Sequence, residues 1–370
     1  MIPLVLARLW QRGAGSLVAP SLAILAALLA GAGLILLAGA NPLVAYQALV
    51  QESLANYYGF ANTLTRTAPL LLTSLGVVVA LRAGQINLGG EGQIYLGGLG
   101  STVVALWLSG SPGWIHLPMS LLGGFCFGGL WGLIPGYLKV NRGINEVITT
   151  LLLNYVGLHL ISYLVSGPLL ESGAPSPYSP LLDITARLPL IMPRTQAHAG
   201  ILLGLVLALV LSLLFRFTPL GYQITAVGLN PVAARYAGMS VGSTVLLSMV
   251  LAGGLAGLAG SCEVLGSKYR LFENFSPGYG FDAIVIGVLS RGNLAGVILT
   301  SFFFGALRSG ANVLQRSAGV PVTVVFAIQG LMILFVAMTL AWEQQRLRHQ
   351  PSPSPPERNF PHASSNASPL

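Results

Sequence analysis

The fold class follows from residues 92–138, which read GQIYLGGLGSTVVALWLSGSPGWIHLPMSLLGGFCFGGLWGLIPGYL. This stretch contains no Asp, Glu, Lys or Arg, whereas about one residue in four is charged in a water-soluble domain. A helix needs about 20 apolar residues to cross the roughly 30 Å hydrocarbon core of a bilayer. Residues 92–138 therefore predict two membrane-spanning helices joined by a short turn.

The rest of the chain has the same character. Of its 370 residues, 54% are hydrophobic and 8% are charged, and the mean hydropathy is +0.76. Hydropathy and the Gly and Pro breaks predict an all-α, polytopic membrane helical bundle with about ten transmembrane segments. These segments are 17–40, 63–82, 93–109, 117–138, 147–166, 199–215, 244–262, 281–290, 294–308 and 320–341. The short eighth and ninth segments are either two spans or one broken or re-entrant element.

Basic residues predict that both termini lie in the cytoplasm, because cytoplasmic loops are enriched in Lys and Arg. With this topology the inner segments hold Arg8, Arg12, Arg82, Lys139, Arg142, Arg216, Arg235, Arg291, Arg346, Arg348 and Arg358. The outer segments hold Arg66, Arg187, Arg194, Lys268, Arg270, Arg308 and Arg316. The domain prediction is a cytoplasmic N-terminus (1–16), a membrane domain (17–342) with a cytoplasmic loop (216–243), and a disordered cytoplasmic tail (343–370).

Several other classes of protein are not expected. The net charge of +8 comes from basic residues scattered singly between apolar runs, so membrane lipid rather than nucleic acid is the expected partner. Cys126 and Cys262 both lie in apolar stretches, and His116, His159 and His198 lack the spacing of metal ligands. We predict no catalytic residue and no metal site.

Three enzyme-like patterns fail on their context. Residues 238–242 read GMSVG, but no strand precedes this nucleophile-elbow pattern. Residues 278–283 fit a dinucleotide fingerprint but precede a membrane span. Residues 266–268 read GSK, with Ser and Lys in the wrong order for a Walker A loop. The chain therefore lacks this route to nucleotide hydrolysis.

Polar residues inside the apolar framework are candidates for a solute pathway, because such groups are retained chiefly where they face a polar interior. Residues 84–93 read GQINLGGEGQ, and an unwound turn there would present Asn87, Glu91 and Gln93 to a solute. The alternative is a solvated cytoplasmic turn in which Asn87 caps a helix. Asn154 lies deeper in the fifth predicted span and is a second candidate for lining the pathway.

Glycine supplies a packing signal. Gly124, Gly128, Gly132 and Gly136 recur every four residues and form one smooth stripe on the fourth predicted span. Gly253 and Gly257 have the same four-residue spacing in the seventh predicted span. Such stripes let helices approach closely in lipid, so we predict a helix-packing role.

Residues 218–238 predict a helical hairpin on the cytoplasmic side. The pattern indicates a short helix, a turn at Gly228-Leu229-Asn230, and a second helix with Pro231 in the favoured first position. This protrusion is either a docking element for a cytoplasmic partner or an inert loop.

Five sequence blocks follow one another along the chain: 87–93 (NLGGEGQ), 145–154 (NEVITTLLLN), 228–238 (GLNPVAARYAG), 252–260 (AGGLAGLAG) and 278–284 (GYGFDAI). In these blocks and their order the chain resembles the permease subunits of ABC importers for nucleosides and simple sugars, a family related more distantly to branched-chain amino acid permeases. The resemblance covers residues 63–341.

The resemblance implies that the hairpin is a coupling loop, with Gly228, Asn230, Pro231, Ala233, Ala234 and Gly238 contacting a separate ATP-binding cassette subunit. ATP would bind on that partner, and this chain would bind no cofactor itself. The resemblance also implies a second permease, as a homodimer or paralogous heterodimer, an extracytoplasmic solute-binding protein, and a bacterial plasma membrane location. Alternating access would then carry the solute across.

Two other classes of function are alternatives to an ABC permease. An ion-coupled secondary transporter or channel would need no ATPase, but it would favour inverted repeats, and none is evident. A membrane-embedded enzyme would need a clustered catalytic set at membrane depth, and the sequence offers none. A branched-chain amino acid permease is a variant within the same class.

Overall fold

The computed structural model describes residues 18–318 and scattered helical positions between 323 and 338. The described part is helical throughout, and its only β features are two isolated bridges, Tyr178–Phe272 and Leu190–His198. This confirms the all-α prediction. The predicted cytoplasmic N-terminus (1–16) and disordered tail (343–370) lie outside the described residues.

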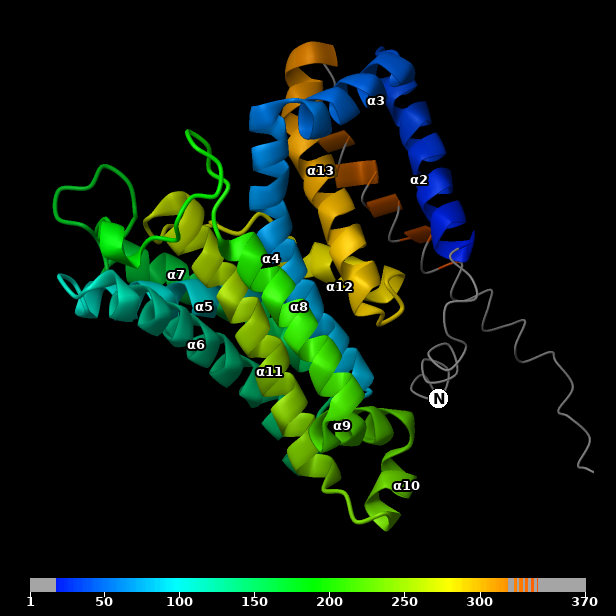
Figure 1. Cartoon of the computed structure of the whole chain (residues 1–370), viewed down its shortest axis with the longest axis vertical. Coiled ribbons are helices and arrows are strands. Elements are labelled where there is room, and N and C mark those ends of the chain that lie inside the picture. The colour runs from blue at the N-terminus through cyan, green and yellow to red at the C-terminus, as the bar shows by residue number, and fades with distance from the viewer. Residues whose placement is uncertain are drawn as a thin grey trace, which may run out of the picture.

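Twelve helices, labelled α2 to α13, run along the described chain (Figure 1). They are α2 (Val18–Leu37), α3 (Pro42–Val50), α4 (Tyr57–Arg82), α5 (Gly90–Trp107), α6 (Gly113–Arg142), α7 (Glu146–Ser166), α8 (Gly200–Phe217), α9 (Pro219–Leu229), α10 (Pro231–Tyr236), α11 (Val241–Cys262), α12 (Tyr279–Leu289) and α13 (Leu294–Ala318). Short π-helical turns follow α3 (Gln51–Ala55) and α11 (Glu263–Lys268), and a 3-10 turn covers Ile184–Ala186.

The spans of the described chain identify a multi-pass membrane protein. Six helices there are long and apolar enough to cross a bilayer: α4, α6, α7, α8, α11 with its π-turn, and residues 294–311 of α13. Residues 25–37 and 42–55 form a further candidate, bent by 118°. Helix α5 is less apolar because it begins with Glu91 and Gln93, yet its residues 90–102 are buried at the centre of the bundle.

Helices α6 and α11 pack with their backbones in contact along the predicted glycine stripe. A Cβ atom at Gly128 would lie 2.4 Å from the Gly253 carbonyl oxygen, and one at Gly132 would lie 2.5 Å from the Met249 carbonyl oxygen. A Cβ atom at Gly257 would lie 2.3 Å from the Gly124 carbonyl oxygen. Any larger side chain at these positions would separate the two helices.

Helix α12 crosses only part of the bundle. Its 11 residues rise about 16 Å, roughly half of a bilayer core. A Cβ atom at Gly90 would lie 3.2 Å from Thr73 Cγ2 and 3.3 Å from Gly280 Cα, so α5 and α12 both begin level with the middle of α4.

Residues 269–278, which precede α12, form a loop of turns and bends, with Tyr269 (φ 58°) and Asn274 (φ 56°) in the left-handed region. They start at the end of the bundle where Leu271 N–H donates to Ser179 Oγ (2.9 Å), and they finish at Gly278, the N-cap of α12. The eighth predicted segment is therefore a short helix reached by a loop. Helix α13, with 25 residues, is a separate element.

Two helices extend beyond their predicted segments. Helix α4 begins at Tyr57 rather than at residue 63, and α13 continues to Ala318 rather than ending at residue 308. Arg66 and Arg308, which were assigned to the outer ends of these segments, therefore lie well inside helices. Arg308 is 6% exposed and satisfies its charge inside the protein, which is why it does not end the helix.

The loops gather at two opposite ends of the bundle (Figure 1). Helices α9 and α10 lie at one end, where Gly228 touches the end of α4 and Arg82 Nη2 donates to the Gly292 carbonyl oxygen at 2.9 Å. At the other end Leu182 N–H donates to the Tyr269 carbonyl oxygen at 3.0 Å. We call these the hairpin end and the loop end.

Candidate functional site

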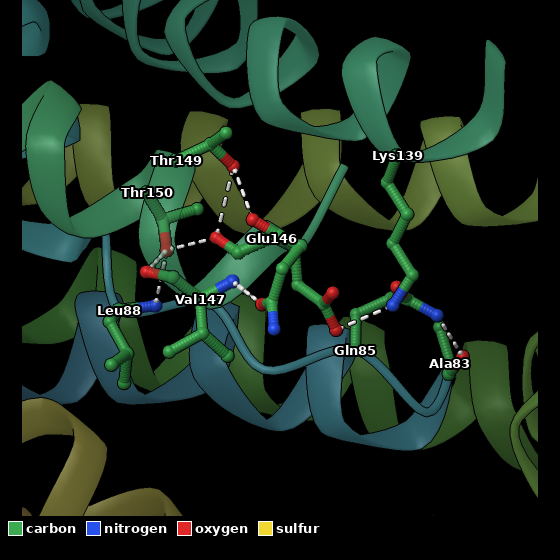
Figure 2. A network of polar contacts seen from close by, with 9 residues as sticks. Ala83, Gln85, Leu88, Lys139, Glu146, Val147, Thr149 and Thr150 are labelled. Carbon is green, nitrogen blue, oxygen red and sulfur yellow. Dashed lines mark hydrogen bonds and ion pairs between the residues drawn. The ribbon is translucent and has the colours of Figure 1, made fainter. Parts of the chain in front are cut away.

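The entrance to α5 is tied to α7 by polar side chains. The Asn154 side chain, from α7, donates to the Leu88 carbonyl oxygen and accepts from Gly92 N–H, both at 2.8 Å. Leu88 N–H donates to Thr150 Oγ1 at 3.3 Å. Figure 2 shows the linker from Ala83 to Leu88 beside the start of α7. The amide of Asn154 thus takes the place of the backbone partners that an unwound segment lacks.

Asn87 and Gln93 hold the same linker from within. Asn87 Nδ2 donates to Gln93 Oε1 at 3.0 Å, and Gln93 Nε2 donates to Asn87 Oδ1 at 3.3 Å. Gly89 N–H also donates to Asn87 Oδ1 at 2.9 Å. The two side chains are 4% and 1% exposed, so the alternative of a solvated turn is wrong.

Glu91 links α5 to α12. Its Oε2 accepts from Gly280 N–H at 2.7 Å and its Oε1 accepts from Gly278 N–H at 3.2 Å. These N–H groups have no partner inside α12, and the positive end of the helix dipole favours a carboxylate there. Glu91 therefore acts as a cap supplied by another helix.

The four residues predicted to line a pathway, Asn87, Glu91, Gln93 and Asn154, thus surround the first turn of α5. In this conformation their polar atoms are hydrogen-bonded to protein groups. A solute contact at these residues stays a prediction.

A buried ion pair joins α12 to α13, and the sequence did not identify it as a site. Arg308 Nε lies 2.6 Å from Asp282 Oδ2, with side-chain exposures of 5% and 10%. Arg308 Nη1 also donates to the Pro277 carbonyl oxygen at 3.0 Å. Glu263 is buried near this pair, and Arg66 and Arg308 both interact electrostatically with it. Buried charges in a membrane domain are functional candidates by default.

The predicted helical hairpin is present as α9 and α10. Asn230 caps α10 by accepting from Val232 N–H and Ala233 N–H, both at 3.0 Å, and Pro231 occupies the first helical position. Local rules suffice to build this element, because a cap and a proline define its start.

The hairpin has one inward and one outward face. Gly228 and Ala234 are buried, whereas Pro231, Ala233 and Gly238 are exposed, and Tyr236 is 89% exposed. A Cβ atom at Gly228 would lie only 2.0 Å from the Arg82 carbonyl oxygen. The hairpin is therefore seated on the end of α4, and apolar side chains such as Val232 and Tyr236 on its other face are exposed.

At the loop end, the connections form an interlocked layer. Asp183 accepts from Ser109 Oγ at 2.7 Å and from Gly110 N–H at 3.1 Å, and these bonds hold the pKa of its carboxyl below the ordinary value. Arg270 forms an ion pair with Glu171. The first two contacts fix Asp183 to the turn between α5 and α6, and the ion pair fixes residues 167–199 to residues 269–278.

The histidines and cysteines serve packing within the described residues, where no group of three or more His, Cys, Asp or Glu could hold a metal ion. His116 is buried, with Nε2 2.8 Å from the Ala105 carbonyl oxygen. Burial lowers the pKa of His198 to about 4, so its ring is uncharged near neutral pH. Cys126 and Cys262 are unpaired.

A bundle of apolar spans with a polar interior, half-crossing helices and a protruding helical hairpin defines a multi-pass transport protein. Its interior has helices that begin at mid-depth, a feature that transport proteins use to build solute sites. The chain belongs to the family described as the branched-chain amino acid transport system / permease component, whose model matches residues 59–337.

Three relatives share the family over most of their lengths. The guanosine ABC transporter permease protein NupP of Bacillus subtilis is 34% identical over 88% of this chain and 94% of its own. A glucose ABC transporter permease protein of Haloferax volcanii is 36% identical over 89% of both chains. The nucleoside ABC transporter permease protein NupB of Lactococcus lactis is 30% identical over 86% of this chain and 90% of its own.

Family membership confirms the resemblance inferred from the sequence blocks. The chain is the membrane-embedded permease of an ABC transporter and not an enzyme, and ATP hydrolysis belongs to a partner subunit. An ion-coupled secondary transporter is not favoured.

Proposed function

We propose that this chain is the permease subunit of an ABC importer that moves nucleosides or simple sugars. The observation that carries the proposal is the identity of 30–36% to permeases named for guanosine, glucose and nucleosides. Branched-chain amino acids are the second candidate class, because the family description names them.

The second permease is proposed to be a paralogue. Bacillus subtilis has two relatives named as guanosine permeases, and this chain is 34% identical to one over 88% of its length and 25% identical to the other over 67%. This chain is 30% identical to one nucleoside permease of Lactococcus lactis over 86% of its length, and 27% identical to the other over 67%. A consistent preference for one member of each pair supports a heterodimer of unlike permeases.

The proposed topology has ten crossings with both termini in the cytoplasm of a bacterium, within the plasma membrane. Arg82, Arg216 and Arg235 lie toward the hairpin end, while Arg187 and Arg270 belong to the loop-end layer. The positive-inside bias supports a cytoplasmic hairpin end. The loop end would then receive an extracytoplasmic solute-binding protein.

Functional residues are proposed in two groups. Those for the ATPase coupling loop are Gly228, Asn230, Pro231, Ala233, Ala234 and Gly238, supported by the seating of this hairpin and its exposed apolar face. Those for the solute pathway are Asn87, Glu91, Gln93 and Asn154, supported by their convergence at the start of α5. ATP would bind only to the partner subunit.

A competition assay tests the solute class. The complex of this chain with its ATPase, second permease and binding protein is reconstituted in proteoliposomes, and uptake of labelled guanosine and labelled glucose is measured. We expect uptake of at least one of them, suppressed by unlabelled members of its own class. Uptake of leucine or valine without uptake of either would contradict the proposal and favour amino acid transport.

The same assay tests the pathway residues. Asn154→Ala removes an amide that holds the α5 entrance, and Asn87→Ala removes the partner of Gln93. For each variant we expect the ratio of inhibitory concentrations between competing nucleosides and sugars to change by about threefold or more. One lost hydrogen bond is worth about 0.5–1.5 kcal/mol. An unchanged ranking, whatever the rate, would remove both residues from the pathway.

A further inference from the structure

Helix α12 is held at both of its ends by residues that flank one linker. At its start, Gly278 N–H and Gly280 N–H donate to the carboxylate of Glu91, which lies in the first turn of α5. At its end, the Gly292 carbonyl oxygen accepts from Arg82 Nη2, at the last residue of α4, at 2.9 Å. The segment between these two residues, 82–91, joins α4 to α5.

The same segment is in direct contact with the hairpin of α9 and α10. A Cβ atom at Gly228 would lie 2.0 Å from the Arg82 carbonyl oxygen and 2.8 Å from Gly84 N. From the other side, a Cβ atom at Gly84 would lie 3.2 Å from Gly228 Cα. Backbone therefore meets backbone, so a displacement of α9 along this direction pushes on residues 82–84 without side chains that could absorb it.

The connections of α12 allow it to move as a unit. Gly278 (φ 91°) precedes it, and Arg291 (φ 50°) and Gly292 (φ 72°) follow it. Chain reversals at glycines commonly act as hinges, because a few residues there absorb large changes in φ and ψ. The helix itself has 11 residues, a loop of turns and bends (269–278) leads into it, and a short turn (290–293) follows it.

We propose that segment 82–91 is a relay that moves α12 when the coupling hairpin moves, with Glu91 and Arg82 as its positioning residues. Motion of the hairpin displaces residues 82–84, and the two attachments carry this displacement to the start and the end of α12. Helix α12 then opens and closes the interior at the level of Thr73 and Gly280. The relay rests on the proposed function, since it needs an ATPase that moves the hairpin.

Removing either attachment of α12 should uncouple ATP hydrolysis from solute uptake. Gly280→Ala places a Cβ atom 2.1 Å from Glu91 N and so separates the start of α12 from the carboxylate that caps it, and Arg82→Met removes the donor to Gly292. In the reconstituted complex we expect the number of ATP molecules hydrolysed per solute to rise at least tenfold for each variant, while ATP hydrolysis stays within about twofold of wild type.

The controls separate a relay from general support of the fold. Arg82→Lys retains a charged donor and should raise the ratio less than about threefold. Tyr46→Phe removes a 2.6 Å hydrogen bond between α3 and the Leu28 carbonyl oxygen of α2, away from the relay, and should leave the ratio unchanged. A ratio that stays constant in Gly280→Ala and Arg82→Met, with uptake and ATP hydrolysis falling together, would overturn the relay. Wild-type uptake that needs no ATP would instead overturn the proposed function.

Discussion

Replacing Gly228 by alanine is expected to reduce ATP-driven uptake by about tenfold to a hundredfold while the protein still inserts into the membrane. The new Cβ atom would lie 2.0 Å from the Arg82 carbonyl oxygen, and backbone cannot yield as the tip of a side chain does. Overpacking of this kind costs about 1–3 kcal/mol, and each 1.4 kcal/mol is a tenfold change. The hairpin must lift from its seat on α4, so its motion no longer reaches the bundle.

The measurement is uptake in proteoliposomes, normalised to the amount of inserted protein. Gly33→Ala is the matched control, because Gly33 also lies in a helix and a Cβ atom there would meet nothing within 4 Å. Uptake by Gly228→Ala equal to that of Gly33→Ala would show that the hairpin seat is not needed for coupling.

Removing Arg308 alone is expected to destabilise the protein by about 3–5 kcal/mol. In Arg308→Met, the Asp282 carboxylate stays buried in the bundle without its partner at 2.6 Å, and an uncompensated buried charge carries this cost. The double variant Asp282→Leu with Arg308→Met removes both charges and should recover most of the loss, because an apolar pair of similar volume is often neutral.

Equilibrium unfolding in mixed micelles gives the four free energies of a double-mutant cycle, those of wild type, Asp282→Leu, Arg308→Met and the double variant. If the losses in free energy of unfolding simply add, the double variant is less stable than either single variant. The two charges would then not compensate each other. Arg308 would then act through its bond to the Pro277 carbonyl oxygen.

The local elements of the fold could be predicted because neighbouring residues define them. The hairpin of α9 and α10 is an example, since Asn230 and Pro231 act within one turn. Helix α3 follows the same rule, since Asn41 caps it and Pro42 is in its first turn. It was not predicted, because hydropathy alone placed residues 41–62 between two spans.

Long-range features were beyond the sequence alone. Asp282 and Arg308 lie in different helices, and nothing in their local sequence pairs them. Arg308 therefore seemed to mark the end of a span. The contacts of residues 84–93 depend in the same way on distant helices: Asn154 of α7 binds Leu88 and Gly92, and Gly280 of α12 binds Glu91. A glycine-rich stretch that also suits a surface turn therefore left two alternatives open.

We expect this chain to move solute only when another chain supplies the energy. Solute accumulation is compared in three sets of proteoliposomes: the full complex with ATP, the full complex with a hydrolysis-deficient ATPase, and this chain alone with a proton or sodium gradient. Accumulation above the external concentration is expected in the first set and none in the other two. Accumulation by the chain alone, driven by an ion gradient, would contradict the dependence on a partner ATPase.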